Sequence, residues 1–295
     1  MTGPYRSAPA ARAGEPGTGV PATAPGASPI HRIVLEPRVR RLTVRRVEDL
    51  SRSLRRVVLT GEELHDFVAL GPTDHAKVFF PARPGGPLEL PVIEGGRWTD
   101  RDDPRLLCRD YTIRTHHPNS GELVLDMAVH GHGPAGRWAA QAAAGQELGL
   151  YGPKTSKIPP MDRDWYVLGA DETGLPALTN WLEQLPSAPG VQAFVEVDSP
   201  EDEVDLPTRD GVVVTWLHRD GAEAGTSALL ADAVAQALAA VHGPGWVWAG
   251  AEASVIRTIR SLVTARGLDR TSFAMTGYWR RGVANFDHKS PEAQA

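Results

Sequence analysis

The sequence predicts a mixed β and α/β fold, in which an N-terminal antiparallel β-barrel is followed by an α/β domain built on a parallel sheet. Three observations predict it. Short stretches of alternating apolar and polar residues, broken by Gly and Pro, occupy residues 39–160. Strand-like and helix-like stretches alternate beyond that point. The pair Pro159-Pro160 separates the two patterns, so we expect domains over residues 31–160 and 161–286.

The first domain contains several short stretches with the period of half-buried strands. They cover residues 40–47, 55–60, 76–80, 88–92, 109–115 and 122–130. Strands at this spacing favour a closed antiparallel barrel. An alanine-rich stretch over residues 138–145, ending in Gly145, predicts a short helix on the barrel.

The second domain alternates between the two element types. Strands are expected over residues 165–170, 191–197, 211–217, 246–249 and 272–276, and helices over residues 175–185, 228–241 and 253–266. This alternation implies a mostly parallel sheet with helices on both faces. Ligands of such a domain bind at the carboxyl ends of the strands.

The composition limits the function classes. Residues 1–30 are rich in Ala, Pro, Gly and Ser, so we expect a disordered tail there and a loose C-terminal tail over residues 287–295. No run of about 18 apolar residues exists, which argues against membrane insertion. The net charge of −5 gives no reason to expect nucleic-acid binding. The single cysteine, Cys108, excludes an internal disulfide framework and fits a cytoplasmic protein. We expect a monomer, since no interface signal stands out.

Two segments carry the chemistry. Arg109-Asp110-Tyr111-Thr112 places a cation, an aromatic ring and a hydroxyl on one strand. The segment from His130 to Ala139, HGHGPAGRWA, passes from a strand through a Gly/Pro turn into a helix, whose N-terminal N–H groups suit a phosphate. An aromatic platform beside a diphosphate cradle suggests a dinucleotide with a flat head, and FAD is the leading candidate. Tyr and Thr also suit any barrel strand, and the glycines also suit any turn.

These segments resemble a known family. Arg109-Asp110-Tyr111-Thr112 is similar to the R-x-Y-T/S flavin motif of the ferredoxin reductase superfamily. The segment at 130–139 resembles the H-x-x-G-P-A-x-x-W-A pattern of its siderophore-interacting branch, the flavin-dependent ferric-siderophore reductases. Residues 169–177, GADETGLPA, and 277–282, GYWRRG, resemble two further motifs of that branch, and all four occur in the family's order. Ala170 departs from the family's usual Asp.

The resemblance implies roles for individual residues toward FAD and a nicotinamide nucleotide. Tyr111 would stack on the flavin, Thr112 would bond near its reactive nitrogen, and Arg109 would bind the diphosphate. Trp279 would cover the flavin or close the domain interface, and His130 would contact the flavin edge. The remaining cofactor candidates are Gly133, Ala135, Gly136, Arg137, Trp138, Asp171 and Thr173. Packing is the alternative for Trp138, and a helix cap is the alternative for Asp171 or Thr173.

Cations near the flavin edge would attract a bulky, anionic ferric siderophore. The candidates for this role are Lys77, Arg114, Lys154 and Arg280, with Lys157 and Arg281 as further possibilities. Arg257 and Arg260 would grip a phosphate of NADPH or be ordinary solvated side chains. His116, His117, His130 and His132 do not predict a built-in metal, because no further ligands converge with them.

The resemblance implies an FAD-dependent ferric-siderophore reductase, in which electrons pass from NAD(P)H through FAD to Fe(III). Two alternatives stay open. The flavoprotein could take electrons from ferredoxin or reduce another acceptor, because the nicotinamide motif is the weakest part of the resemblance. The fold could also bind ferric siderophore without redox chemistry.

Overall fold

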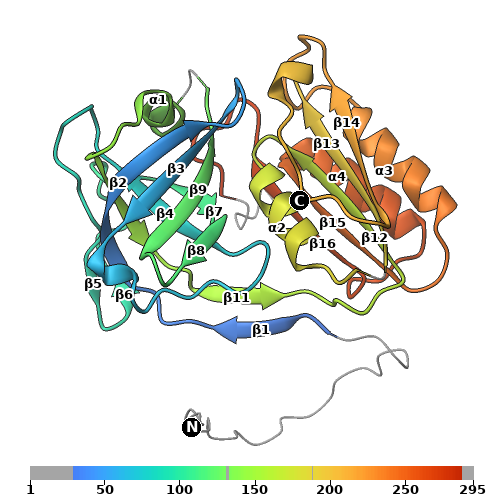
Figure 1. The fold of residues 1–295 in the computed structure, drawn as a ribbon, viewed down its shortest axis with the longest axis horizontal. Coiled ribbons are helices and arrows are strands. Elements are labelled where there is room, and N and C mark those ends of the chain that lie inside the picture. Colours follow the sequence, from blue (N-terminus) through green and yellow to red (C-terminus); the bar gives the residue numbers. More distant parts are fainter. Residues whose placement is uncertain (1–28, 131–132, 188, 288–295) are drawn as a thin grey trace, which may run out of the picture.

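The computed structural model describes residues 29–130, 133–187 and 189–287. The predicted mixed β and α/β fold is confirmed: a curled antiparallel sheet and a parallel sheet lie side by side (Figure 1). The expected tails lie outside the described residues, apart from residues 29, 30 and 287. The division of the chain near residue 160 stays a prediction.

The first half is built on a seven-stranded antiparallel sheet. Its strands, in spatial order, are β7 (Leu107–Thr112), β4 (His75–Phe80), β10 (Glu147–Tyr151), β2 (Val39–Asp49), β3 (Leu54–Thr60), β9 (Glu122–Ala128) and β8 (Thr115–His117). Among the described residues, the outer strands β7 and β8 do not pair with each other. The barrel is therefore a curled half-barrel, and the expectation of a closed one is wrong.

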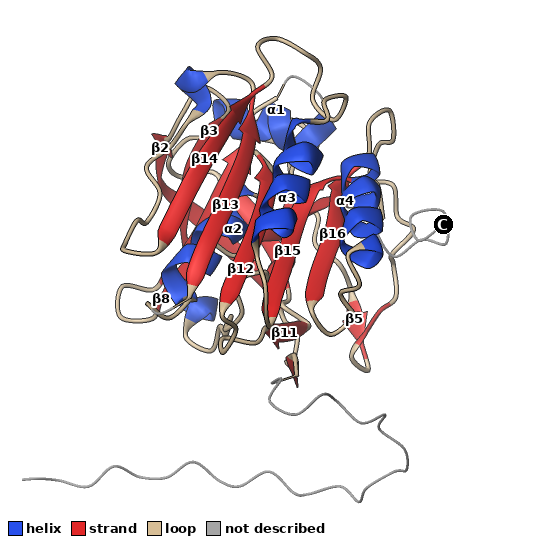
Figure 2. Ribbon diagram, turned by 90° about the vertical axis from the view of Figure 1, so that its right-hand side faces the viewer, coloured by secondary structure: helices blue, strands red, loops and turns tan. Residues whose placement is uncertain are grey.

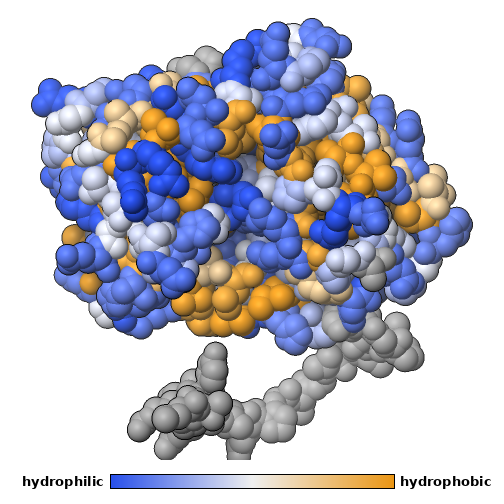
Figure 3. Space-filling view, in the orientation of Figure 1, coloured by the Kyte–Doolittle hydropathy of each residue, from blue (hydrophilic) through white to orange (hydrophobic). Residues whose placement is uncertain are grey.

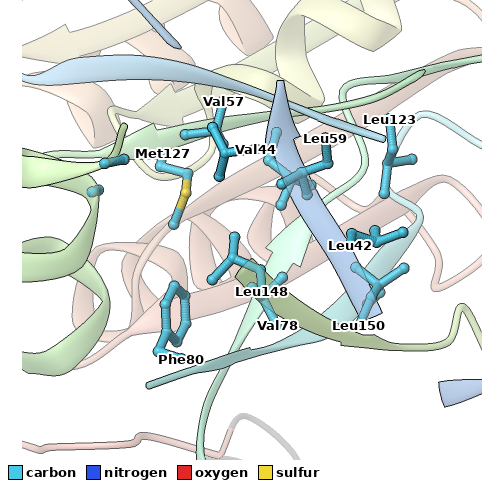
Figure 4. Close-up of a cluster of buried hydrophobic side chains, with 14 of the residues drawn as sticks. Leu42, Val44, Val57, Leu59, Val78, Phe80, Leu123, Met127, Leu148 and Leu150 are labelled. Carbon is cyan, nitrogen blue, oxygen red and sulfur yellow. The ribbon is translucent and has the colours of Figure 1, made fainter. Parts of the chain in front are cut away.

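Apolar side chains fill the concave side of this half-barrel. Leu42, Leu59, Leu123, Leu148 and Leu150 are fully buried there and point toward one another (Figure 4). The alternation of apolar and polar residues produces this arrangement, since every second side chain of a strand faces the core. Helix α1 (Gly133–Gln141) closes one end of the core.

Smaller elements complete the first half. They are the two-stranded pairs β1 (His31–Val34) with β11 (Thr155–Ile158) and β5 (Ile93–Glu94) with β6 (Arg97–Trp98), and the short 3-10 helix η1 (Glu62–Leu64). The expected strand over residues 88–92 is wrong, because this segment is irregular. It contains Pro91, which has no N–H for a sheet ladder. Leu88 nevertheless packs against Phe79 and Tyr151.

The second half is a five-stranded parallel sheet, as predicted. Its strands, in spatial order, are β14 (Val212–His218), β13 (Gly190–Val197), β12 (Trp165–Asp171), β15 (Gly245–Glu252) and β16 (Phe273–Trp279). The first strand of this half, β12, lies in the middle of the sheet. Strands β13 and β14 follow on one side of it, and β15 and β16 on the other, so a topological switch point lies between β12 and β15.

Helices cover both faces of the parallel sheet. Helices α3 (Leu229–Ala240) and α4 (Ala253–Ala265) pack on the outer face (Figure 2). Helix α2 (Leu175–Gln184) packs on the other face, between the sheet and the half-barrel (Figure 1). The 3-10 helix η2 (Pro200–Asp202) follows β13. Helix α4, with 13 residues, is the longest in the described part of the chain, and no helix there is long and apolar enough to cross a membrane.

Two polar clusters join the halves. Arg52, in the turn between β2 and β3, forms ion pairs with Asp198 at 2.8 Å and with Asp202 at 2.7 Å. Arg114, just after β7, forms an ion pair with Glu183 of α2 at 2.5 Å and donates to Asn180 Oδ1 at 3.0 Å. The first cluster holds the β2–β3 turn, and the second the end of β7, against the parallel-sheet half.

Candidate functional site

The predicted motif residues converge where β7, α1 and the carboxyl edge of the parallel sheet meet. Strand β7 supplies Arg109, Tyr111 and Thr112, and pairs with β4 throughout its length. Hydrophilic residues line the seam between the halves on the face shown in Figure 3. The seam is therefore the candidate site.

Tyr111 and Arg109 lie on the edge strand of the half-barrel. The Tyr111 ring is partly buried against Phe80, with 6.1 Å between ring centroids, and burial raises the pKa of its hydroxyl. Arg109 Nη1 donates to Cys108 O at 2.6 Å and to Asn285 Oδ1 at 3.1 Å. The C-terminal segment thus reaches back to the guanidinium that was predicted to bind a diphosphate.

Thr112 makes a contact that the sequence did not indicate. It is buried, and its hydroxyl lies near that of Tyr278 from the other half. Burial raises the pKa of Tyr278 to about 12, although the nearby Thr112 hydroxyl acts in the opposite direction. Tyr278 belongs to the motif at residues 277–282, but only Trp279, Arg280 and Arg281 of that motif were predicted to take part in the site.

A β-bulge explains why these neighbours point to different partners. Gly277 pairs with Ala251 and Trp279 pairs with Glu252, so Tyr278 is the extra residue on β16. A bulge locally changes the direction of side chains and is common beside functional sites. Trp279 Nε1 donates to Asp171 Oδ2 at 2.7 Å.

Helix α1 begins at Gly133, five residues before the expected helix. Pro134, at the start of the helix, suits this position because its missing N–H would have no helical partner. Gly133 has a φ of +71°, and a Cβ built there would meet nothing within 4 Å. This open backbone at a helix N-terminus fits the close approach of a phosphate.

The other predicted residues of α1 serve different purposes. A Cβ on Gly136 would lie 2.5 Å from His130 O, so this glycine permits packing against His130 rather than against a ligand. Ala135 and Trp138 are buried in the barrel core, and Trp138 packs on Phe80 at 5.6 Å. Their positions support packing rather than the expected cofactor contact. Arg137 and His130 are exposed, whereas Gly131 and His132 lie outside the described residues.

Asp171 is the centre of the carboxyl edge of the parallel sheet. Its Oδ1 accepts hydrogen bonds from Thr173 N at 2.9 Å and Thr173 Oγ1 at 2.6 Å, and its Oδ2 accepts one from Glu252 N at 3.1 Å. Burial raises the pKa of Asp171, although the bonds from Thr173 and Trp279 act against this rise. The expected helix cap is wrong for both residues, because the N-cap of α2 is Gly174 without a side-chain cap; Asp171 instead accepts bonds from the turn before the helix.

Charged neighbours surround Asp171. Burial raises the pKa of Glu172, which is partly offset by an ion pair with Arg219 at 2.5 Å. Burial alone would raise the pKa of Glu252, but hydrogen bonds from Ser254 and from backbone N–H groups lower it. Arg219 was not predicted, because it follows a strand far from every recognised motif.

The four predicted substrate cations lie in different environments. Lys77 forms an ion pair with Asp110 at 3.0 Å, and Lys154 lies over the Tyr151 ring at 4.8 Å. Arg280 is half-buried at the turn after β16. Arg114 is nearly buried in its ion pair with Glu183, so it joins the halves rather than offering a free cation to substrate.

The geometry suits FAD. The Tyr111 ring and Trp138 of α1 both pack on Phe80, Gly133 begins that helix with open backbone, and Arg109 lies two residues before Tyr111, on the same face of β7. These groups supply the phosphate cradle, the ring platform and the cation that a flavin dinucleotide needs. The residues present therefore fit FAD. No group of three or more His, Cys, Asp or Glu side chains within the described ranges is placed to hold a metal ion.

Comparisons with known proteins agree with this geometry. A model of the siderophore-interacting FAD-binding domain matches residues 43–157, and a model of the siderophore-interacting protein matches residues 163–282. The ferric vibriobactin reductase ViuB of Vibrio cholerae is 36% identical over 79% of this chain and 86% of its own length. The NADPH-dependent ferric-chelate reductase of Escherichia coli is 33% identical over 82% of this chain and 93% of its own length.

A solved structure matches most of this chain. It is a siderophore utilization protein from T. fusca, which is 39% identical with a TM-score of 0.83, over 88% of this chain and all of that one. The similarity thus spans both halves and the seam between them.

Proposed function

The chain belongs to the siderophore-interacting protein family, and from this premise we propose that it is an FAD-dependent ferric-siderophore reductase. The observation that carries the proposal is the meeting of Arg109, Tyr111 and the open N-terminus of α1 on one side of the half-barrel. When bound, FAD would accept two electrons together from a nicotinamide nucleotide and release them one at a time to Fe(III).

The side chains of β7 would hold and orient the cofactor. Arg109 supplies a planar guanidinium that matches phosphate oxygens. Tyr111 supplies a ring already fixed by Phe80, so little side-chain freedom is lost when a flavin stacks on it. Thr112, near Tyr278, holds a hydroxyl at the seam, which is the position we propose beside the reactive part of the ring.

The ferric siderophore would approach along the seam. Arg114 is engaged with Glu183, so Lys154 and Arg280 are the candidates we retain for an anionic chelate. The oxygen ligands that hold Fe(III) tightly hold Fe(II) weakly, so reduction releases the iron. No side chain need act as nucleophile or general acid.

A cytoplasmic setting and a monomeric state are part of the proposal. The setting is supported by the need for a reduced nicotinamide nucleotide and by the single cysteine, Cys108, which has no partner for an internal disulfide.

The proposal is tested by absorption spectroscopy of the purified protein before and after addition of FAD and desalting. We expect oxidised-flavin bands that survive desalting. The bands should bleach under nitrogen on addition of NADH or NADPH and return on addition of a ferric siderophore, with Fe(II) trapped by a coloured chelator. Protein that retains no FAD, yet whose tryptophan emission is quenched by ferric siderophore, would be a binding module. Bleaching by reduced ferredoxin alone would identify the other electron route.

A further inference from the structure

The carboxyl edge of the parallel sheet, where a nicotinamide nucleotide would bind, is occupied by the protein's own carboxylates. Asp171, Glu196 and Glu252 lie at or near the ends of β12, β13 and β15, and their exposed fractions are only 5%, 3% and 2%. In most sheets of this kind the backbone N–H groups at this edge are available to phosphates.

Each carboxylate binds the N–H groups at the start of a different helix or of the turn before it. Asp171 accepts from the N–H groups of Thr173 and Gly174, in the turn that leads into α2. Glu252 accepts from those of Ser254 and Val255 at the start of α4, at 2.5 and 3.2 Å. Glu196 accepts from Leu230 N in α3 at 3.4 Å and from Ser227 Oγ at 2.7 Å. The donors that a pyrophosphate would use thus already have anionic partners.

Three of the cations around this edge are also engaged. Arg219 contacts Glu172 at 2.5 Å and Glu196 at 3.6 Å. Arg281 forms an ion pair with Glu223 at 3.0 Å. Arg260 of α4 donates to Met275 O at 3.1 Å. A phosphate arriving here would have to displace a carboxylate from each of the first two.

The loop between β14 and α3 covers the same edge. Gly225 of this loop, with a φ of +76°, packs closely on Glu252 and Trp279. A Cβ there would be 2.6 Å from Glu252 Cγ and 3.3 Å from the Trp279 ring. The space beneath it, lined by Asp171, Glu196 and Glu252 among others, is too small to hold even a water molecule. Small-molecule sites usually measure about 300–1,000 Å³, so no nucleotide fits there while these side chains keep their positions.

We infer that this chain recognises its nicotinamide donor through the nicotinamide half alone and binds the adenosine phosphate half weakly. Asp171, Glu196 and Glu252 are the residues that set this specificity, because they fill the phosphate positions with negative charge. The inference rests on the proposed function. It implies that NADH and NADPH serve almost equally well, and that reduced nicotinamide mononucleotide, which lacks the adenosine half, is also a donor.

Equilibrium binding tests the inference without turnover. The FAD-loaded protein is titrated calorimetrically at low ionic strength with 2′,5′-ADP, ADP-ribose and NADP⁺. We expect no saturation by 2′,5′-ADP or ADP-ribose below about 1 mM, which corresponds to less than roughly 4 kcal/mol of binding free energy. A dissociation constant in the low micromolar range for either compound would overturn the inference, and its loss in Arg257→Ala would locate the phosphate site on α4.

A matched pair of variants tests whether the carboxylates cause the weak binding of the adenosine phosphate half. Glu252→Gln keeps an oxygen for the N–H groups of α4 but removes one negative charge, so the affinity for 2′,5′-ADP should rise at least about fivefold. Asp210→Asn removes an equal charge just before β14, at the opposite edge of the sheet, and should leave the affinity unchanged. Equal affinities in Glu252→Gln and the parent protein would refute the assignment to the carboxylates.

Donor kinetics give an independent measure. Rates of anaerobic flavin bleaching by NADPH, NADH and reduced nicotinamide mononucleotide should agree within about tenfold, a barrier difference of roughly 1.4 kcal/mol. A preference of more than about a hundredfold for NADPH would overturn the inference. Flavin first reduced by dithionite and then reoxidised by ferric siderophore tests the proposed function separately, because that step uses no nicotinamide donor.

Discussion

Asn180 offers a direct test of how the two halves are held together. This residue of α2 is buried at the seam, and its amide makes three hydrogen bonds to the half-barrel. Asn180 Nδ2 donates to Pro72 O at 3.1 Å and to Ile113 O at 2.8 Å, and Oδ1 accepts from Arg114 at 3.0 Å. Ile113 follows Thr112 directly, so the contact fixes the end of the strand that carries the proposed flavin residues.

The substitution Asn180→Ala should therefore be costly. It leaves two buried carbonyl oxygens without these donors, and each such loss costs about 1–3 kcal/mol. Alanine recovers about 0.5 kcal/mol through its higher helix propensity. The free energy of unfolding should fall by about 1.5–5.5 kcal/mol, which lowers the melting temperature by roughly 2–9 °C in a chain of 295 residues.

Urea unfolding followed by tryptophan fluorescence measures the loss, and FAD release on dilution measures its effect at the seam. The matched control is Thr179→Ala, because the Thr179 hydroxyl donates to Leu175 O within the same helix and not across the seam to any described residue. Its unfolding free energy should change by less than half as much, with FAD retention unaltered. A change below about 0.5 kcal/mol in Asn180→Ala, the range of ordinary surface substitutions, would refute the reasoning.

Three further outcomes are expected. Arg109→Ala should weaken FAD binding by about 1.5–3 kcal/mol, the value of a hydrogen bond to a charged group; unchanged affinity in a fluorescence titration would show that Arg109 is not a diphosphate ligand. Tyr278 keeps its proton up to about pH 12 in the folded protein but only to about pH 10 when unfolded. Its contribution to the free energy of unfolding is therefore fully present below pH 10 and is lost, by about 2–3 kcal/mol, between pH 10 and 12. That slope, measured by urea unfolding, should be shallower in Tyr278→Phe. Gly174→Ala should lower stability by at least about 2–3 kcal/mol, because its Cβ would lie 1.9 Å from Gly250 O, whereas Gly190→Ala, with open space around it, should not.

Local pattern predicted most of the strands and helices, and it failed where one residue overrode the pattern. Strand β10 was missed because Gly149 interrupts its apolar run. A Cβ at Gly149 would lie 2.2 Å from Leu90, so the glycine is required by packing that only the folded chain reveals. At residues 88–92 the error was the opposite one, a strand predicted where none forms. The alternation there suggested a strand, but Pro91 has no N–H for the sheet ladder.

The motif residues of the site were predictable, but their partners were not. Arg109, Tyr111 and Thr112 lie on one strand, as the alternation indicated. The partners of Arg114 lie 66 and 69 residues away in sequence, on a helix with no distinctive motif. Sequence alone therefore suggested a substrate contact for Arg114, because a cation near a flavin motif has no visible partner until the chain folds.

Tyr278 and Trp279 show why the seam is the functional part of the molecule. The bulge at Tyr278 sends two consecutive side chains to opposite halves, one to Thr112 of the half-barrel and the other to Asp171 at the carboxyl edge of the parallel sheet. The Trp279–Asp171 bond lies within the parallel-sheet half, whereas the Tyr278–Thr112 contact crosses the seam. The hydroxyl at the proposed flavin position and the carboxylate at the proposed donor position are thus both contacted by a single dipeptide. Direct electron transfer from donor to flavin requires such fixed placement, because reacting groups must approach closely and in register.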